Sequence, residues 1–208
     1  MTDPAHPREA ALVPAQAALL LIDVQNYEVA RRRQRNDPAD AWYLHELATV
    51  TIPAMQRLLW ACRNARIEVL HTTIESLTLD GRDRSLDYKI TPIHVPKGSW
   101  DARPIEEVAP IGDEIVLPKT SSSVFVSTTI DYVLRNLGVR QLIIAGLLTD
   151  QCVESAVRDA CDLGYLVTLV TDATATHTPE RHAASLRAIR GYCRQRTADQ
   201  VIAEISGG

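Results

Sequence analysis

The stretch AALLLIDV, residues 17–24, is an apolar run whose one charged side chain, Asp23, comes at its end. A short, continuous apolar run of this kind is typical of a β-strand buried on both faces. Similar runs recur at IEVLHTT (67–73), DEIVLPK (113–119), QLIIAG (141–146) and YLVTLVTD (165–172), and VIAEI (201–205) predicts a terminal strand. Strands buried on both faces occur in parallel sheets, because crossover helices cover both sides.

Helical patterns fill the intervals between these runs. Residues 50–64 carry apolar side chains at helical spacing, further helices are expected over 127–138 and 150–164, and Thr178-Pro179-Glu180 predicts the start of a last one. Strands that alternate with helices predict a doubly wound α/β fold. At 208 residues, one domain over 1–208 is expected, with residues 1–15 as an amino-terminal tail.

The charge pattern argues against a nucleic-acid partner. The formal net charge is −4, whereas phosphate binding needs a basic surface. Arg31, Arg32, Arg33 and Arg35 form the one basic cluster. Short charge runs are usually solvated, so we interpret this cluster as an exposed face and not as an anion site.

No feature of the sequence predicts export or a membrane span. The start, MTDPAHPREAALVP, lacks the charged-then-apolar order of a secretory signal. The longest apolar run, 17–22, is far shorter than the roughly 20 residues that a bilayer-spanning helix needs. The four cysteines form no CxxC pair, which favours reduced thiols and a cytoplasmic protein.

Reactive side chains follow several predicted strands. Parallel α/β sheets bind ligands at the carboxyl ends of their strands. Asp23, Lys119, Cys152 and Asp172 all stand at or just past such ends. Residues 74–112 show no clear periodicity, so we expect a long loop region that covers the site.

Cys152 is the strongest candidate nucleophile. It follows a turn after a strand and opens a predicted helix, where the helix dipole and free N–H groups acidify a thiol and can receive an oxyanion. The alternative is that Cys152 is only a small buried hydrophobe. That interpretation is favoured for Cys62, Cys161 and Cys193, which lie inside helical patterns.

Asp23 and Lys119 each have an ordinary alternative. Asp23 could cap a helix, and Lys119 could be solvated. Together with Cys152, however, they provide a base, a cation and a thiol at one rim of the sheet, which is what nucleophilic acyl transfer requires.

Three motifs, in this order and spacing, resemble those of the isochorismatase-like cysteine hydrolases over residues 15–205. They are LLLIDVQN (19–26), IVLPK (115–119) and AGLLTDQCVESAVRDACDLGY (145–165). KGSWD (97–101) is similar to the ureidoacrylate amidohydrolase branch. The resemblance implies a six-stranded parallel sheet with helices on both faces, the triad Asp23, Lys119 and Cys152, no cofactor, and a homodimer or homotetramer.

Two departures from related enzymes narrow the expected chemistry. Isochorismatases carry a non-nucleophilic residue where Cys152 stands, so the thiol favours amide hydrolysis. Nicotinamidases place an Asp-x-His metal motif after the second strand, where this chain reads HTTIESL (71–77). We therefore expect no metal site and interpret His71 as a core histidine.

The sequence predicts an amidohydrolase that cleaves a C–N bond of a small ureido or carbamoyl compound, or of a primary amide, through a thioester. The alternatives are a nicotinamidase- or maleamate-type amidase, and a catalytically idle binding module of the same fold. A redox sensor built on Cys152 is disfavoured, because no second cysteine lies nearby in the sequence.

Further site residues are expected around this triad. The resemblance implies a cis peptide bond at Leu147–Leu148, so that the N–H groups of Leu148 and Cys152 form an oxyanion hole. Six residues near the same rim are predicted to contact substrate: Gln25, Asn26, Tyr27, Glu75, Trp100 and Phe125.

Overall fold

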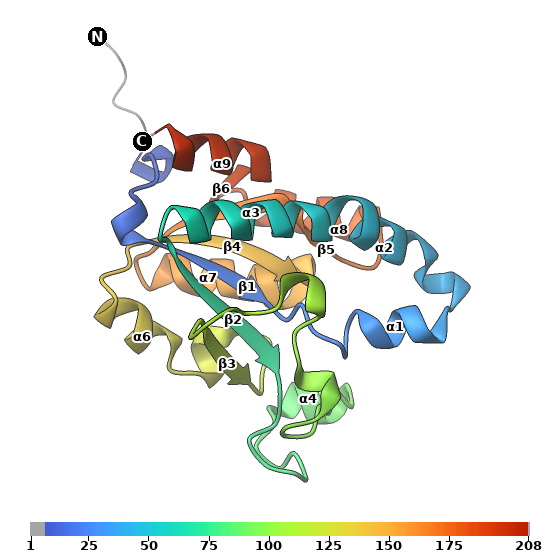
Figure 1. Ribbon diagram of the computed structural model, residues 1–208. Helices are drawn as coiled ribbons and strands as arrows, with labels where there is room; N and C mark the ends of the chain where they lie inside the picture. Colours follow the sequence, from blue (N-terminus) through green and yellow to red (C-terminus); the bar gives the residue numbers. More distant parts are fainter. Residues whose placement is uncertain (1–6, 208) are drawn as a thin grey trace.

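A six-stranded parallel sheet forms the centre of the molecule, as the computed structural model of residues 7–207 shows (Figure 1). The strands are β1 (Ala17–Ile22), β2 (Glu68–Ile74), β3 (Ile115–Lys119), β4 (Gln141–Leu147), β5 (Leu166–Ala175) and β6 (Arg194–Arg196). Their order is β3-β2-β1-β4-β5-β6, and each neighbouring pair is parallel. The predicted fold class is confirmed. Strand order reverses between β1 and β4, and this is the point where such sheets open a ligand crevice.

Helices cover both faces of the sheet (Figure 1). They are α1 (Ala30–Arg35), α2 (Ala41–Glu46), α3 (Ile52–Asn64), α4 (Leu86–Ile90), α5 (Val124–Ser127), α6 (Ile130–Asn136), α7 (Glu154–Asp162), α8 (Pro179–Ile189) and α9 (Ala198–Ser206). Short 3₁₀ turns lie at Pro7–Glu9, Pro14–Gln16, Pro38–Asp40, Trp100–Ala102 and Glu106–Val108, and wider π-type turns at Leu47–Thr51 and Thr149–Val153.

Successive side chains of β1 enter opposite halves of the core, which explains why its sequence is apolar throughout. Leu19 and Leu21 pack in one hydrophobic cluster with α3 and α9. Leu20 and Ile22 pack in the other with α6 and α7. A strand buried in this way cannot show the alternation of polar and apolar residues that marks a strand with one solvated face.

Gly146 allows β4 to run close beside β1 up to the end of both strands. Its φ is +124°, and a Cβ atom placed there would lie 2.2 Å from the carbonyl oxygen of Ile22. The pairing of β4 with β5 also shifts register between Ile144 and Gly146. A glycine is therefore required immediately before Leu147 and Leu148, where the chain enters the site.

The predicted terminal strand at 201–205 is wrong, because these residues belong to α9. Thr197 and Gln200 form a capping box at the start of this helix. Ala198, Val201 and Ile205 are its buried residues, and their spacing of three and four positions is helical. The sixth strand is instead the short segment β6, which pairs with β5.

Part of the expected amino-terminal tail packs against the sheet. Residues 1–6 lie outside the described part of the chain. Leu12 is buried, and the side-chain amide of Gln141 on β4 accepts a hydrogen bond from the Val13 N–H and donates one to the Ala11 carbonyl. Over residues 7–207, no helix has the length and apolar character needed to cross a membrane.

Candidate active site

Asp23, Lys119 and Cys152 meet at the carboxyl ends of the central strands. Lys119 Nζ lies 2.8 Å from Asp23 Oδ2 and donates to Cys152 Sγ at 3.2 Å. All three side chains are buried. The convergence predicted from the sequence is therefore present in the structure. The site combines an acid–base group, a cation and a thiol in an enclosed space, which is suited to nucleophilic acyl transfer.

Asp23 is held in a tight bend just past β1. Its φ of +54° is in the left-handed region, and its N–H donates to the carbonyl of Thr72 on β2. Its Oδ1 accepts a hydrogen bond from Thr72 Oγ1 at 2.8 Å. Because α1 begins only at Ala30, with Val29 at its cap position, the alternative that Asp23 caps a helix is wrong.

Lys119 is completely buried and uses its three N–H bonds within the protein. It donates to Tyr88 Oη at 3.0 Å, to the Ser121 carbonyl at 2.9 Å and to Cys152 Sγ. Burial alone would lower the pKa of Lys119, but the Asp23 carboxylate, helped by Cys152 and Tyr88, outweighs it and raises that pKa. Lys119 therefore stays protonated, and the alternative that its side chain is exposed to solvent is wrong.

The second oxygen of Asp23 faces both Lys119 and the thiol. Oδ2 forms an ion pair with Lys119 Nζ at 2.8 Å, and a hydrogen bond between the Asp23 carboxylate and the thiol contributes to the raised pKa of Cys152. A carboxylate placed in this way can accept a proton from the thiol. Asp23 is therefore a candidate proton acceptor beside Cys152.

The Cys152 thiol is protonated in the free site. Burial raises its pKa to about 12, although the Lys119 ammonium acts in the opposite direction. This direction is opposite to the acidification that a helix start alone would produce. Cys152 lies inside the turn Thr149–Val153 ahead of α7. Burial destabilises a thiolate here more than the Lys119 ammonium, which is already paired with Asp23, stabilises it.

Tyr88 is a site residue that the sequence did not reveal. Its hydroxyl accepts the hydrogen bond from Lys119 and lies 3.8 Å from Cys152 Sγ. It comes from α4, which Ser85 caps by accepting a hydrogen bond from the Tyr88 N–H. The only sequence signal was that 74–112 should cover the site, and no periodicity singled out one aromatic residue within it.

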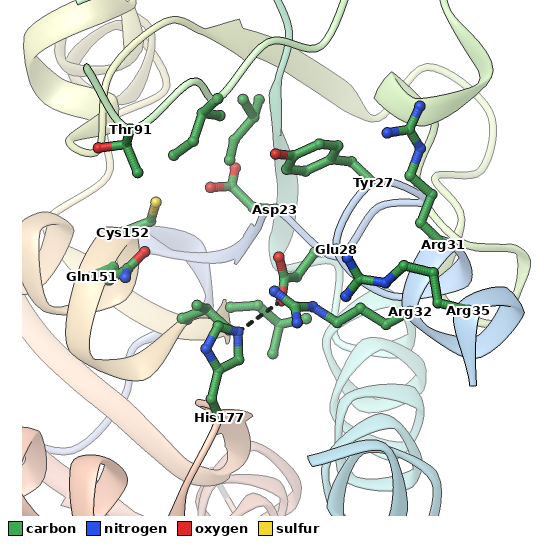
Figure 2. A pocket seen from close by; sticks show the side chains of 14 residues that line it. Asp23, Tyr27, Glu28, Arg31, Arg32, Arg35, Thr91, Gln151, Cys152 and His177 are labelled. Carbon is green, nitrogen blue, oxygen red and sulfur yellow. Dashed lines mark hydrogen bonds and ion pairs between the residues drawn. The ribbon is translucent and has the colours of Figure 1, made fainter. Parts of the chain in front are cut away.

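A cavity of about 330 Å³ opens beside the triad (Figure 2). Cys152 and Gln151 lie on one side of it, Asp23 and Tyr27 in the middle, and Arg31 and Arg35 on the opposite side. The remaining lining residues are Glu28, Arg32, Ile74, Thr91, Ile93, Leu147, Leu148 and His177. The cavity that leads to Cys152 therefore has a wall with both polar and apolar side chains.

The predicted cis peptide bond at Leu147–Leu148 is confirmed. Both residues line the cavity together with Cys152. The carbonyl of Leu148 accepts hydrogen bonds from the N–H groups of Gln151 and Val153, which fixes the turn that carries Cys152. An oxyanion hole formed by the Leu148 and Cys152 N–H groups stays a prediction.

Of the six residues predicted to contact substrate, the structure places only Tyr27 on the wall of this cavity. Gln25 is fully buried, and its amide bonds with both backbone groups of Ile74 and with the Asp101 carbonyl. Asn26 donates to the Trp100 carbonyl. The hydrogen bonds of these two side-chain amides connect the loops around the site, so they hold the cavity wall in place without being part of it.

Glu75, Trp100 and Phe125 also lie outside the cavity wall. Glu75 accepts a hydrogen bond from the Gly98 N–H. Trp100 is 45% exposed and lines a separate hollow, and Phe125 packs against Tyr165. Closeness in sequence to a strand end gave the correct region for these residues but not the direction of their side chains.

Metal-ligating side chains do not gather at the site. Within residues 7–207 there is no group of three or more histidine, cysteine, aspartate or glutamate residues that could hold a metal ion. His71 is buried, with Nε2 3.2 Å from Glu114 Oε2, and burial lowers its pKa despite that carboxylate. It occupies β2 as a neutral, hydrogen-bonded core residue.

Comparisons with known proteins agree with this architecture. The isochorismatase domain profile matches residues 17–201. The ureidoacrylate amidohydrolase RutB of Agrobacterium fabrum is 30% identical over 190 residues, which cover 84% of this chain and 82% of that protein. The RutB of Rhizobium rhizogenes is also 30% identical, with 84% and 76% covered.

Solved structures share the fold. A cysteine hydrolase from Pseudomonas syringae pv. phaseolicola superposes with a TM-score of 0.83 at 24% identity, covering 100% of this chain and 99% of that one. An isochorismatase family protein from Desulfovibrio vulgaris has a TM-score of 0.74 at 27% identity, with 90% and 98% covered. N-carbamoylsarcosine amidase from Thermoplasma acidophilum has a TM-score of 0.72 at 23% identity, with 88% and 97% covered.

Proposed function

The chain belongs to the isochorismatase family of hydrolases, and from that premise we propose that it is a cysteine-dependent amidohydrolase. Its substrate is a small ureido or carbamoyl compound or a primary amide, and the bond cleaved is a C–N bond. The observation that carries the proposal is the buried contact of Lys119 with both Asp23 and Cys152. Similarity to proteins named ureidoacrylate amidohydrolase supports the ureido class.

The reaction begins with proton transfer from Cys152 to Asp23. Because the free thiol is protonated, attack requires a base at the moment of reaction, and we assign this role to Asp23, which is paired with Lys119 and interacts with the thiol. Sγ then forms a bond with the carbonyl carbon of the substrate. The Lys119 ammonium stabilises the charge during transfer, and the N–H groups of Leu148 and Cys152 receive the carbonyl oxygen as its negative charge develops.

Collapse of the tetrahedral adduct breaks the C–N bond. Asp23 returns its proton to the leaving nitrogen, so that ammonia departs from a ureido group or primary amide and the acyl group stays on Cys152. Water then attacks the acyl carbon, giving its proton to Asp23, and the C–S bond breaks while Asp23 passes that proton to Sγ, which regenerates both the thiol and the carboxylate. From a ureido substrate the product is a carbamate, which loses carbon dioxide to leave an amine.

Tyr88 acts by positioning the lysine. Its hydroxyl takes one of the three Lys119 N–H bonds, which directs another of them at Cys152 Sγ.

Ammonia release from a panel of ureido compounds and primary amides tests the proposal. The wild type should release ammonia from at least one ureido compound, and Cys152→Ala should not. Cys161→Ala is the matched control, because Cys161 lies on α7 away from the cavity wall. Release only from a nicotinamide- or maleamate-like amide would replace the substrate class. No release from any compound would favour an idle binding module.

A further inference from the structure

The turn Thr149–Val153 carries Cys152 and is called the nucleophile turn below. It is wider than a turn of an α-helix, because the N–H groups of Gln151 and Val153 both donate to the carbonyl of Leu148, at 3.1 and 3.2 Å. Turns of this π type are rare, and a rare backbone conformation persists only where its surroundings hold it. Contacts from outside the turn are therefore expected to fix the position of Cys152.

Side chains of β5 and α8 hold both ends of the nucleophile turn. At its start, Thr149 Oγ1 lies 3.0 Å from Thr174 Oγ1 and 2.9 Å from His182 Nδ1. Burial lowers the pKa of His182, so its ring is neutral at pH 7 and shares a hydrogen bond with the Thr149 hydroxyl. Just past the turn, the Ser185 hydroxyl donates to the Glu154 carboxylate at 2.6 Å.

Asp150 holds the middle of the turn, and both of its carboxylate oxygens are bound. Oδ1 accepts a hydrogen bond from Thr176 Oγ1 at 2.6 Å. Oδ2 lies 2.6 Å from both Nε and Nη2 of Arg181, which belongs to α8. A guanidinium that contacts one oxygen through two N–H groups fixes its direction as well as its distance, which the single ammonium of a lysine does not. Since Asp150 precedes Cys152 by two residues, Arg181 acts on the backbone that presents the thiol.

Arg181 also contacts the cavity wall. Its Nη1 lies 3.4 Å from His177 Nδ1, and His177 Nε2 lies 3.3 Å from Glu28 Oε1 (Figure 2). Because an arginine only donates, Nδ1 of the neutral His177 ring is the acceptor, and Nε2 carries the proton toward Glu28. Glu28 in turn binds Arg32 at 2.8 Å. The Arg32 side chain is only 19% exposed, so the interpretation of the basic cluster as an exposed face is wrong for this residue.

The pair of Arg181 with Asp150 is expected to matter more for geometry than for stability. The side chains of Arg181 and Asp150 are 41% and 18% exposed, and ion pairs with an exposed partner contribute little to the free energy of unfolding. A displacement of about 1 Å at a reacting group can, in contrast, cost about 10²-fold in rate. Loss of this pair should therefore affect catalysis far more than global unfolding.

We propose that Arg181 is a positioning residue, an inference that rests on the proposed hydrolysis at Cys152. Through Asp150 it holds the nucleophile turn so that Cys152 Sγ and the N–H groups of the proposed oxyanion hole face the same point. Arg181 is not part of the cavity wall, so it acts on the reaction through the turn and not by binding substrate.

Steady-state kinetics with a ureido substrate that the wild type cleaves test the effect on catalysis. Arg181→Gln should lower kcat about 10–100-fold with little change in KM, because the turn shifts while the cavity wall keeps its side chains. Arg181→Lys should recover only part of the loss. In the Asp150→Asn background, Arg181→Gln should have a much smaller effect than in the wild type, because the two residues act as a unit. Arg187→Gln is the matched control, since Arg187 is exposed on the same helix, and it should keep the wild-type kcat.

Hydrogen–deuterium exchange measures the nucleophile turn without any substrate. In Arg181→Gln, the backbone N–H groups of residues 149–154 should exchange about tenfold faster than in the wild type, while those of β1 keep their rate. Arg187→Gln should change neither. Exchange that accelerates by the same factor in both segments would show that Arg181 only stabilises the fold, and would overturn the inference.

The two measurements separate this inference from the proposed reaction. If the wild type cleaves no ureido compound or primary amide but exchange at residues 149–154 accelerates in Arg181→Gln, the proposed reaction fails and the positioning of the turn by Arg181 stands. Where hydrolysis is measured, a kcat of Arg181→Gln close to that of the wild type would overturn the inference. An unchanged exchange rate at residues 149–154 would overturn it in either case.

Discussion

At Cys152, burial and a neighbouring ammonium act on the pKa of one thiol in opposite directions, and burial has the larger effect. In the proposed mechanism, removal of the thiol proton therefore accompanies attack on the substrate instead of preceding it. The proposed base, Asp23, is then as important as the nucleophile.

The pH dependence of alkylation reports this balance. With a thiol pKa of about 12, the rate at which iodoacetamide modifies Cys152 should still be rising at pH 10, because the thiolate fraction grows with pH. Lys119→Met removes the cation that lowers this pKa, so alkylation at any given pH should be slower. The measurement is the mass of the Cys152 peptide over time. A rate that levels off near pH 7 would contradict it.

Asp23→Asn should lose turnover while keeping substrate binding. The amide retains the size of the carboxylate but cannot accept the thiol proton, and general-base loss typically costs about 10²–10⁴-fold in rate. Steady-state kinetics give the loss in kcat, and calorimetry gives the affinity. Near-normal turnover would mean that the base lies elsewhere.

Tyr88→Phe should lower kcat about tenfold, because it removes one hydrogen bond to the Lys119 ammonium, which contacts Cys152. The effect on KM should be small, because neither Tyr88 nor Lys119 is part of the cavity wall. Tyr132→Phe is the control, because Tyr132 is 71% exposed on α6. A purely structural role predicts instead that kcat of the folded protein and the alkylation profile of Cys152 stay unchanged.

At the scale of elements, strands buried on both faces were predictable and short turns were not. The first five apolar runs correspond to β1–β5, because a continuous apolar run of that length fits a two-sided core. The segment VIAEI (201–205) was wrongly predicted as a strand, because a short apolar run fits a strand or a buried helix equally well. The capping box at Thr197 favours the helix. The helix expected at 127–138 is α6, which begins later, at Ile130, because the separate short helix α5 ends at Ser127.

The cap of α9 gives a test at this scale. Thr197→Ala should lower the free energy of unfolding by about 1 kcal/mol, the usual cost of losing such a cap, and leave kcat unchanged because α9 lies away from the cavity wall. Urea denaturation measures the free energy of unfolding, and steady-state kinetics measure kcat. An unchanged unfolding midpoint would show that packing of Val201 and Ile205 alone holds the helix.

For the whole molecule, topology explains which parts of the site could be found in the sequence. The reversal of strand order beside β1 gathers residues from the ends of β1, β3 and β4, so Asp23, Lys119 and Cys152 were predictable from their positions. Tyr88 and the cavity-facing arginines lie on short helices within connecting segments. Their directions depend on how those segments fold back over the sheet, which no local pattern records.

Two whole-molecule expectations stay predictions. Residues 1–208 should unfold as one domain, and the chain should form a homodimer or homotetramer. Coincident unfolding curves from different spectroscopic probes would support a single domain. Light scattering would decide the oligomeric state.

The most direct test of the central claim is mass spectrometry of the protein quenched in acid during turnover of a ureido substrate. The proposed mechanism predicts a transient mass increase equal to the acyl group, located on the peptide that contains Cys152 and absent in Cys152→Ala. Ammonia release that continues in Cys152→Ala, with no adduct on the wild-type peptide, would contradict nucleophilic catalysis by this thiol.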